Sequence, residues 1–312
     1  MLTKNINFIN FQNKKKSKSI LNSLKLILSG NNEIILSLKK NYKNSYGKKI
    51  LKLFKNKNDY RIVGMGGSIL GANAIYDFLN DKIKKKFYFI NNLQANHSKL
   101  FKKNYNNLII LKSGNTLETI VNFNILVKKK DKNLFITEDK NSYLKKIANE
   151  LKSEVISHNN YIGGRYSVLS EVGIIPSYLM GLNILNLRKN LKRHLTKDNK
   201  SFLKDSVVKL SQIMEKKQYT NLIFLNYCPK FEKFLEWCQQ LIAESLGKKR
   251  KGFLPIISNV PKDHHSLLQL YLDGPRDKIF YIFNSHETEK KRMNVKKYYK
   301  KINYLNNKTL SQ

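Results

Sequence analysis

The chain has 312 residues, 41% of them hydrophobic, which is enough for two domains of ordinary size with buried cores. Lysine and arginine number 59 against 22 aspartates and glutamates, so the formal net charge is +37. No stretch has the ~20 apolar residues of a membrane-spanning helix, and the two cysteines fit neither a zinc site nor a paired redox motif. We therefore expect a soluble, cytoplasmic protein that does not bind a membrane.

The positive charge is spread along the chain rather than gathered on one helix or stripe. No zinc finger, basic zipper or aromatic RNA-binding signature accompanies it. Lysine, asparagine and isoleucine are all abundant and all have AT-rich codons, so the base composition of the gene accounts for much of the excess. We expect no specific nucleic-acid partner, although a positive field would help to attract a phosphate dianion.

Short β-rich runs alternate with longer helical patterns after a basic, helical extension that spans residues 1–55. This alternation is typical of a parallel α/β sheet. A first α/β domain is expected over residues 56–195, with strands at residues 61–63, 87–90, 108–111 and 134–137. A long helical segment from Ser167 to about Leu187 is expected before the C-terminal end of this domain.

The pattern begins again in a second α/β domain, expected over residues 196–312. Apolar residues at helical spacing predict a helix from Leu203 to Met214, and later runs predict a strand at 222–225, a helix at 231–246 and a strand at 279–283. The final residues are mostly charged and amide-rich, so this domain is expected to be incomplete at its C-terminus.

The first strand runs into the turn Gly64-Met65-Gly66-Gly67-Ser68-Ile69-Leu70-Gly71. A dinucleotide fingerprint would need glycine at Ile69, and a P-loop would need a following Gly-Lys-Ser or Gly-Lys-Thr, so neither cofactor class is expected. What remains is a plain strand-to-helix turn, or a turn where backbone N–H groups and the Ser68 hydroxyl approach an anionic or polyol ligand.

The run Lys112-Ser113-Gly114-Asn115-Thr116 follows an apolar strand and precedes a helical pattern. The strand leads into a glycine-relaxed loop, the hydroxyl and amide side chains point outward, and the free N–H groups of the next helix face an anion. The sequence therefore predicts a phosphate cradle and a phosphorylated ligand.

Arg165 follows the paired glycines Gly163 and Gly164, which allow an unusual backbone path. An arginine so placed could stabilise a developing oxyanion, and Ser167 is expected to cap the helix that follows. A surface arginine is the alternative interpretation.

In the helix predicted at 231–246, Gln240 and Glu244 are four residues apart beside an apolar stripe. Partial desolvation and the negative end of the helix dipole would both raise the pKa of Glu244 toward that of a general base. A solvent-facing glutamate is the alternative.

The pair His264-His265 begins a further helix-like run. One of the two histidines is either an acid/base group or a plain residue at the start of a helix. No further ligands stand at a metal-binding spacing, so a metal site is not expected.

Taken together, these motifs resemble the phosphoglucose isomerase family, which is built from sugar-isomerase domains, from about Val63 to about Gly274. The turn at 64–71 resembles the family's Gly-Gly-Ser turn, and residues 112–119 resemble its phosphate loop in a Ser-Gly-Asn-Thr form. Three further segments resemble its Gly-Gly-Arg-Tyr-Ser, Glu-Ser-Asn-Gly-Lys and histidine motifs, namely residues 163–167, 244–248 and 265–270.

The resemblance implies two sugar-isomerase-type α/β sandwich domains in series. It also implies an enzyme of glycolysis and gluconeogenesis that interconverts glucose 6-phosphate and fructose 6-phosphate through an enediolate, without a metal or other cofactor. Family members are typically homodimers whose active sites are shared, since a histidine crosses into the partner's site. A bifunctional glucose and mannose phosphate isomerase, and a non-catalytic sugar-phosphate sensor of the same fold, are the alternatives.

The resemblance also implies residue roles. Glu244 would move the proton between C1 and C2, Arg165 would stabilise the enediolate, and His265 would help to open the sugar ring. The substrate-binding residues would be Gly67, Ser68, Lys112, Ser113, Asn115, Thr116 and Gln240.

Three departures from the family pattern stand out. Leu246 replaces the usual asparagine, and Asp263-His264 replace the usual Gly-Gln. The family's C-terminal segment, with its glutamine and lysine, has no match between His286 and Gln312, so we expect either a truncated chain or ring opening that lacks one of its usual groups.

Overall fold

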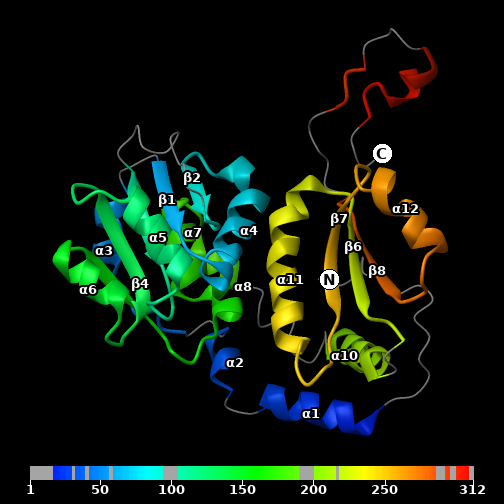
Figure 1. Cartoon of the computed structure of the whole chain (residues 1–312), viewed down its shortest axis with the longest axis horizontal. Coiled ribbons are helices and arrows are strands. Elements are labelled where there is room, and N and C mark those ends of the chain that lie inside the picture. Colours follow the sequence, from blue (N-terminus) through cyan, green and yellow to red (C-terminus); the bar gives the residue numbers. More distant parts are fainter. Residues whose placement is uncertain are drawn as a thin grey trace. The chain divides into compact units, whose positions relative to one another are not determined.

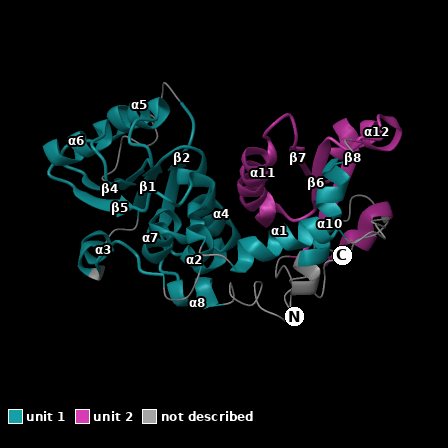
Figure 2. Ribbon diagram, turned by 90° about the horizontal axis from the view of Figure 1, so that it is seen from below, with its two compact units in different colours: residues 1–217 teal, residues 218–312 magenta. Residues whose placement is uncertain are grey.

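A computed structural model describes residues 17–29, 32–38, 42–55, 59–93, 105–189, 200–215, 218–285, 292–295 and 300–308. The chain forms two compact units, Met1–Lys217 and Gln218–Gln312 (Figures 1 and 2). The division lies beyond the boundary expected near residue 195, because helix α10 (Lys200–Glu215) packs against helix α1 (Lys18–Ser29) within the first unit.

The first unit is built on a five-stranded parallel sheet in the order β2-β1-β3-β4-β5. Its strands are β1 (Asp59–Val63), β2 (Lys86–Ile90), β3 (Asn106–Ile110), β4 (Lys132–Glu138) and β5 (Glu154–His158). Four of them confirm the predicted strands. The sequence analysis missed β5, because this edge strand reads Glu-Val-Ile-Ser-His and lacks the continuous apolar run of a central parallel strand.

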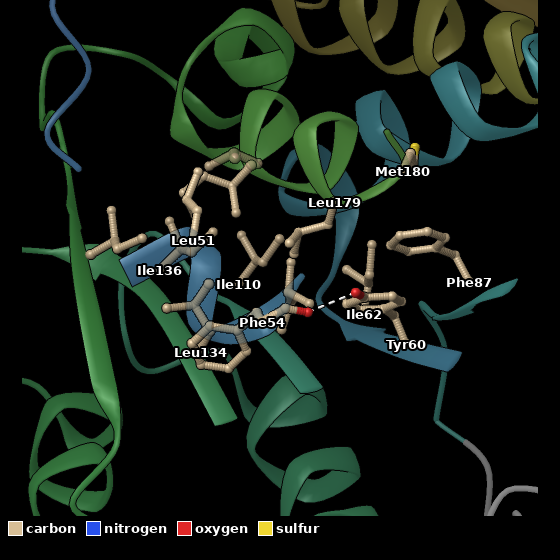
Figure 3. Close-up of a cluster of buried hydrophobic side chains, with 14 of the residues drawn as sticks. Leu51, Phe54, Tyr60, Ile62, Phe87, Ile110, Leu134, Ile136, Leu179 and Met180 are labelled. Atoms are coloured by element: carbon tan, nitrogen blue, oxygen red, sulfur yellow. Dashed lines mark hydrogen bonds between the residues drawn. The ribbon is translucent and has the colours of Figure 1, made fainter. Parts of the chain in front are cut away.

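Helices cover both faces of this sheet (Figure 1). Helices α3 (Lys48–Phe54), α4 (Leu70–Phe78) and α7 (Glu171–Leu179) pack on one face, whereas α5 (Leu117–Leu126) and α6 (Tyr143–Glu150) pack on the other. Figure 3 shows the larger core, in which the Tyr60 hydroxyl donates to the Phe54 carbonyl at 2.7 Å. The strands are therefore held from both sides, and their carboxyl ends have fixed positions.

The long helical segment predicted from Ser167 to about Leu187 is helical over most of its length, but it is broken into three pieces. The segment consists of a 3₁₀ helix, η4 (Gly164–Leu169), then α7, then α8 (Ile184–Lys189). Ser170 has an extended backbone, and Gly181 has a φ of +87°, a left-handed conformation that favours glycine and ends α7. The N-terminal part is helical as expected, with α1, α2 (Glu33–Ser37) and α3; residues 1–16 lie outside the described ranges.

The second unit contains a three-stranded parallel sheet in the order β7-β6-β8. Its strands are β6 (Asn221–Asn226), β7 (Leu254–Asn259) and β8 (Lys278–Phe283), with helices α11 (Glu232–Leu246) and α12 (His264–Asp273). Helix α11 packs against β7, which the sequence analysis missed. Two parallel α/β sheets in series confirm the predicted fold class. In the residues described above, we find no helix with the length and apolar character to cross a membrane.

Candidate active site

A cavity of about 260 Å³ lies at the carboxyl ends of the strands in the first unit. The chain leaves β1 toward β2 on one side and continues from β3 toward β4 on the other, so β1 and β3 flank the point where the strand order reverses. Ligands of open parallel sheets bind in the crevice at such a point. The cavity is lined by Met65, Ser68, Leu111, Lys112, Ser113, Thr116, Glu138 and Lys140.

The predicted phosphate loop forms one wall of this cavity. The Ser113 and Thr116 hydroxyl oxygens lie 3.4 Å apart, and α5 begins directly after Thr116 with no side-chain hydrogen bond at its N-cap. The first N–H groups of α5 are therefore not capped by that side chain and face the loop region. The Asn115 side chain instead accepts a hydrogen bond from the Tyr143 backbone at 3.3 Å, which ties the loop to α6.

Glu138 and Lys140 line the same cavity, and the sequence analysis did not single them out. The Glu138 carboxylate lies 3.2 Å from Lys112 Nζ and 2.8 Å from Lys140 Nζ. Burial alone would raise the pKa of Glu138, but hydrogen bonds from Lys140 and Lys112 outweigh it and lower that pKa. Two cations and one anion leave one net positive charge at the cavity. The sequence analysis predicted β4, so Glu138, which directly follows the apolar run of that strand, could have been recognised as a candidate site residue.

The loop that carries Arg165 packs closely against the turn after β1. A Cβ atom on Gly67 would lie 2.2 Å from the Gly164 carbonyl carbon, so only glycine fits there. The Ser167 hydroxyl lies 2.6 Å from the Gly164 carbonyl and 3.1 Å from the Gly67 carbonyl. It does not cap the following helix, which corrects the predicted cap. The Arg165 guanidinium lies 4.5 Å from the Tyr166 ring centroid. The first unit thus brings together the Ser68 turn, the phosphate loop and the Arg165 loop.

The two remaining predicted groups belong to the second unit. On the last turns of α11, Gln240 Nε2 donates to Glu244 Oε2 at 3.2 Å, so the amide orients the carboxylate. Glu244 is exposed, which agrees with the solvent-facing alternative of the sequence analysis. The carboxylate is accessible and held from one side by Gln240.

Helix α12 begins at His264 as the sequence predicted. The His264 ring is half-buried and packs edge-on against Tyr227, with ring centroids 6.0 Å apart, whereas the His265 side chain is exposed. This packing favours a structural role for His264, and of the two histidines only His265 has an exposed side chain. No three His, Cys, Asp or Glu side chains gather as metal ligands within the described ranges.

The fold is shared with solved structures. A hypothetical protein from Thermus thermophilus superposes with a TM-score of 0.69 at 20% identity, covering 96% of this chain and 75% of that one. A glucose-6-phosphate isomerase from Chlamydia trachomatis superposes with a TM-score of 0.57 at 19% identity, covering 86% of this chain and 56% of that one.

Relatives found by sequence share a higher identity with this chain than the solved structures above do. Glucose-6-phosphate isomerase from Methanocaldococcus jannaschii is 36% identical over 246 residues, which cover 72% of this chain and 60% of the relative. The same enzyme from Acholeplasma laidlawii is 34% identical over 291 residues, which cover 84% of this chain and 68% of the relative. The chain thus spans about 60 to 68% of the length of these relatives. The phosphoglucose isomerase profile matches residues 38–253, well over half of the chain, and the chain therefore belongs to the phosphoglucose isomerase family.

Proposed function

We propose that this chain interconverts glucose 6-phosphate and fructose 6-phosphate, a step of glycolysis and gluconeogenesis. The observation that carries the proposal is the cavity at the carboxyl ends of β1, β3 and β4, where two hydroxyls and a net positive charge stand at the N-terminus of α5. Such a site suits a phosphate dianion, because backbone N–H groups and hydroxyls donate to its oxygens. Membership of the family supplies the reaction class.

The proposed chemistry is a proton transfer between neighbouring carbons. Glu244 removes the proton from C2 of the open-chain aldose, and the electron pair moves into an enediolate. The Arg165 guanidinium stabilises the negative charge on the enediolate oxygens while the hydroxyl proton passes from O2 to O1. Glu244 then returns its proton to C1, and O2 becomes the carbonyl oxygen of the ketose. His265 moves a proton between the ring oxygen and O1 when the ring opens. Atoms and charge balance without a metal or organic cofactor.

Binding would be shared among the remaining predicted residues. Ser113 and Thr116 would donate to the phosphate, while Lys112 would add its charge and Ser68 would contact the sugar. Gly67 and Asn115 shape the site, since the missing Cβ of Gly67 makes room for the Arg165 loop and the side chain of Asn115 holds the phosphate loop to α6. A firm grip on the phosphate orients the carbon chain, so its binding energy lowers the barrier at C1 and C2.

A sensor that binds sugar phosphates without turnover would need the phosphate loop but would have no use for a carboxylate held by Gln240. That pair favours the enzyme. An isomerase that also accepts mannose 6-phosphate differs only in how the site holds C2.

We propose further that two copies share their active sites, as the family resemblance implies. Cys228 and Cys238 form no disulfide, which fits a location in the reducing cytoplasm.

Replacing Ser113 and Thr116 together with alanine is expected to weaken binding of fructose 6-phosphate by at least about tenfold, because two hydrogen bonds to a charged phosphate are lost. Isothermal titration calorimetry with fructose 6-phosphate and with inorganic phosphate measures this directly. Ser153→Ala is the matched control, since the Ser153 hydroxyl hydrogen-bonds the Leu151 carbonyl at the amino end of β5, whereas the cavity lies at the carboxyl ends of the strands. Equal affinity of the double variant and the wild type would refute the assigned phosphate site.

A further inference from the structure

A buried histidine and glutamate lie at the two ends of the segment that carries Arg165. His158 is the last residue of β5, and Glu171 is the first residue of α7. The His158 Nδ1 and Glu171 Oε2 atoms are 3.5 Å apart, and both side chains have 0% exposure. The pair therefore joins the two ends of residues 159–170 at the base of that segment.

The two ring nitrogens of His158 both face acceptors. Its Nε2 lies 3.2 Å from the Ile162 carbonyl, which can only accept, so Nε2 carries a hydrogen. Its Nδ1 faces the Glu171 carboxylate at 3.5 Å. One side chain thus fixes both Glu171 and Ile162, the residue that directly precedes the paired glycines of the Arg165 loop.

The N-terminal segment completes the network. The Glu171 carboxylate accepts from the Ser45 backbone at 2.9 Å, and the Tyr42 hydroxyl lies 3.2 Å from both carboxylate oxygens. The same hydroxyl accepts from Asn159 Nδ2 at 2.7 Å. Burial raises the pKa of Tyr42, so its hydroxyl keeps its proton at neutral pH and can donate to Glu171.

The segment held by this network contacts the proposed substrate site at three points. Lys112 Nζ of the phosphate loop donates to the Asn160 carbonyl at 3.0 Å. Gly164 lies against Gly67, and the Ser167 hydroxyl lies within hydrogen-bond distance of both the Gly164 and the Gly67 carbonyls. A shift of residues 159–164 would therefore move Arg165, the Ser68 turn and the lysine of the phosphate loop together.

We propose that His158 and Glu171 are positioning residues, which fix the Arg165 loop and couple its geometry to the N-terminal segment around Tyr42. Neither residue touches the cavity, and both act through the backbone of residues 159–164. The role in catalysis rests on the proposed function, whereas the role in fixing the loop does not.

The sign of the pH dependence follows from the charged surroundings. The titratable groups that face Glu171 are His158, Tyr42, Tyr46, Tyr161 and Arg188. Burial would raise the pKa of Glu171, but hydrogen bonds from His158 and the Ser45 backbone outweigh it and lower that pKa. A lowered carboxyl pKa contributes stability above the ordinary value of about 4.3, and that stability is lost as the pH falls through the folded-state pKa. The loop should therefore loosen as the pH falls into the acid range.

The decisive variant is Glu171→Gln. The carboxylate accepts from three donors, and an amide with one oxygen cannot satisfy all of them. Hydrogen–deuterium exchange on the 312-residue chain should show amides of residues 159–167 exchanging about tenfold faster than in the wild type at neutral pH. In a fructose 6-phosphate assay, kcat should fall more than KM rises, because Arg165 acts on the enediolate rather than on the bound ketose.

Tyr42→Phe is a milder test, because it removes one hydroxyl and leaves the charged pair intact. Tyr60→Phe is its matched control, since it removes a buried hydroxyl that bonds the Phe54 carbonyl at the amino end of β1. Faster amide exchange of residues 159–167 is expected in Tyr42→Phe and not in Tyr60→Phe. If Glu171→Gln does not fold, this comparison alone tests whether the network fixes the Arg165 loop.

Exchange that is unchanged in Glu171→Gln or Tyr42→Phe would overturn the proposal whatever the activity. Faster exchange in a chain whose wild type binds no sugar phosphate would leave the positioning role standing and remove the proposed function instead.

Discussion

Glu244→Gln is expected to lower the rate of fructose 6-phosphate isomerisation by about 10² to 10⁴, while substrate binding stays close to that of the wild type. A general base contributes a factor of this size, and the amide cannot accept the proton from carbon. The exchange keeps the shape of the side chain and retains an oxygen that can accept from Gln240 at the 3.2 Å position. Steady-state kinetics and calorimetry with fructose 6-phosphate separate the two effects.

Glu236→Gln is the matched control for this prediction. Glu236 lies on the same helix and pairs with Lys233 at 2.6 Å, so the same chemical change is made about two turns from Glu244. Its turnover should equal that of the wild type. A Glu244→Gln protein with the wild-type rate would mean that another group carries the proton.

Asp131→Asn is expected to lower the free energy of unfolding by about 3 to 5 kcal/mol, the usual cost of breaking a buried ion pair from one side. Asp131 lies 3.0 Å from Arg61 Nη2, and both side chains are 2% exposed. Its carboxylate also accepts from Asn107 Nδ2 at 3.2 Å and from the Lys128 backbone at 3.1 Å. Asparagine removes the negative charge that lies 3.0 Å from the buried Arg61 guanidinium and offers one oxygen in place of two.

Urea-induced unfolding followed by circular dichroism measures the loss, and a lower midpoint with an unchanged slope is the expected result. Asp139→Asn removes an exposed carboxylate that pairs with Lys145, and it should leave the midpoint where it is. An Asp131→Asn midpoint equal to that of the wild type would show that the Arg61 charge is compensated in another way.

The row of side chains behind this prediction also explains why the sheet has one register. Arg61, Asn107 and Asn133 are register partners on β1, β3 and β4, and Asn107 bonds both of the others, at 2.8 Å and 2.7 Å. Slipping a strand by one residue would leave these buried polar groups unpaired.

Much of the fold was predictable because central parallel strands are continuous apolar runs. Ile62, Leu108 and Leu134 are fully buried, and each lies in a short apolar run that predicts a strand. The edge strand β5 and the broken helix after it were not recognised. The edge strand lacks a continuous apolar run, and the break before α7 comes with contacts of Glu171 to residues more than 100 positions away, which local patterns do not encode.

The candidate site was predictable in part for a similar reason. Ser68, Lys112, Ser113 and Thr116 follow strands whose carboxyl ends meet at one edge, so their convergence follows from the strand order. The exposure of Glu244 was not predictable, because it depends on what packs beside the last turns of α11 rather than on the apolar stripe. The pair of His158 and Glu171 was also missed, since its partners come from separate segments of the chain.

The measurement that tests the central claim most directly is a coupled assay of fructose 6-phosphate conversion to glucose 6-phosphate by the 312-residue chain, run beside its Glu244→Gln variant. We expect turnover by the chain that is lost in the variant, with fructose 6-phosphate bound by both. Binding without turnover by the unaltered chain would contradict the enzyme and leave a sugar-phosphate sensor of the same fold.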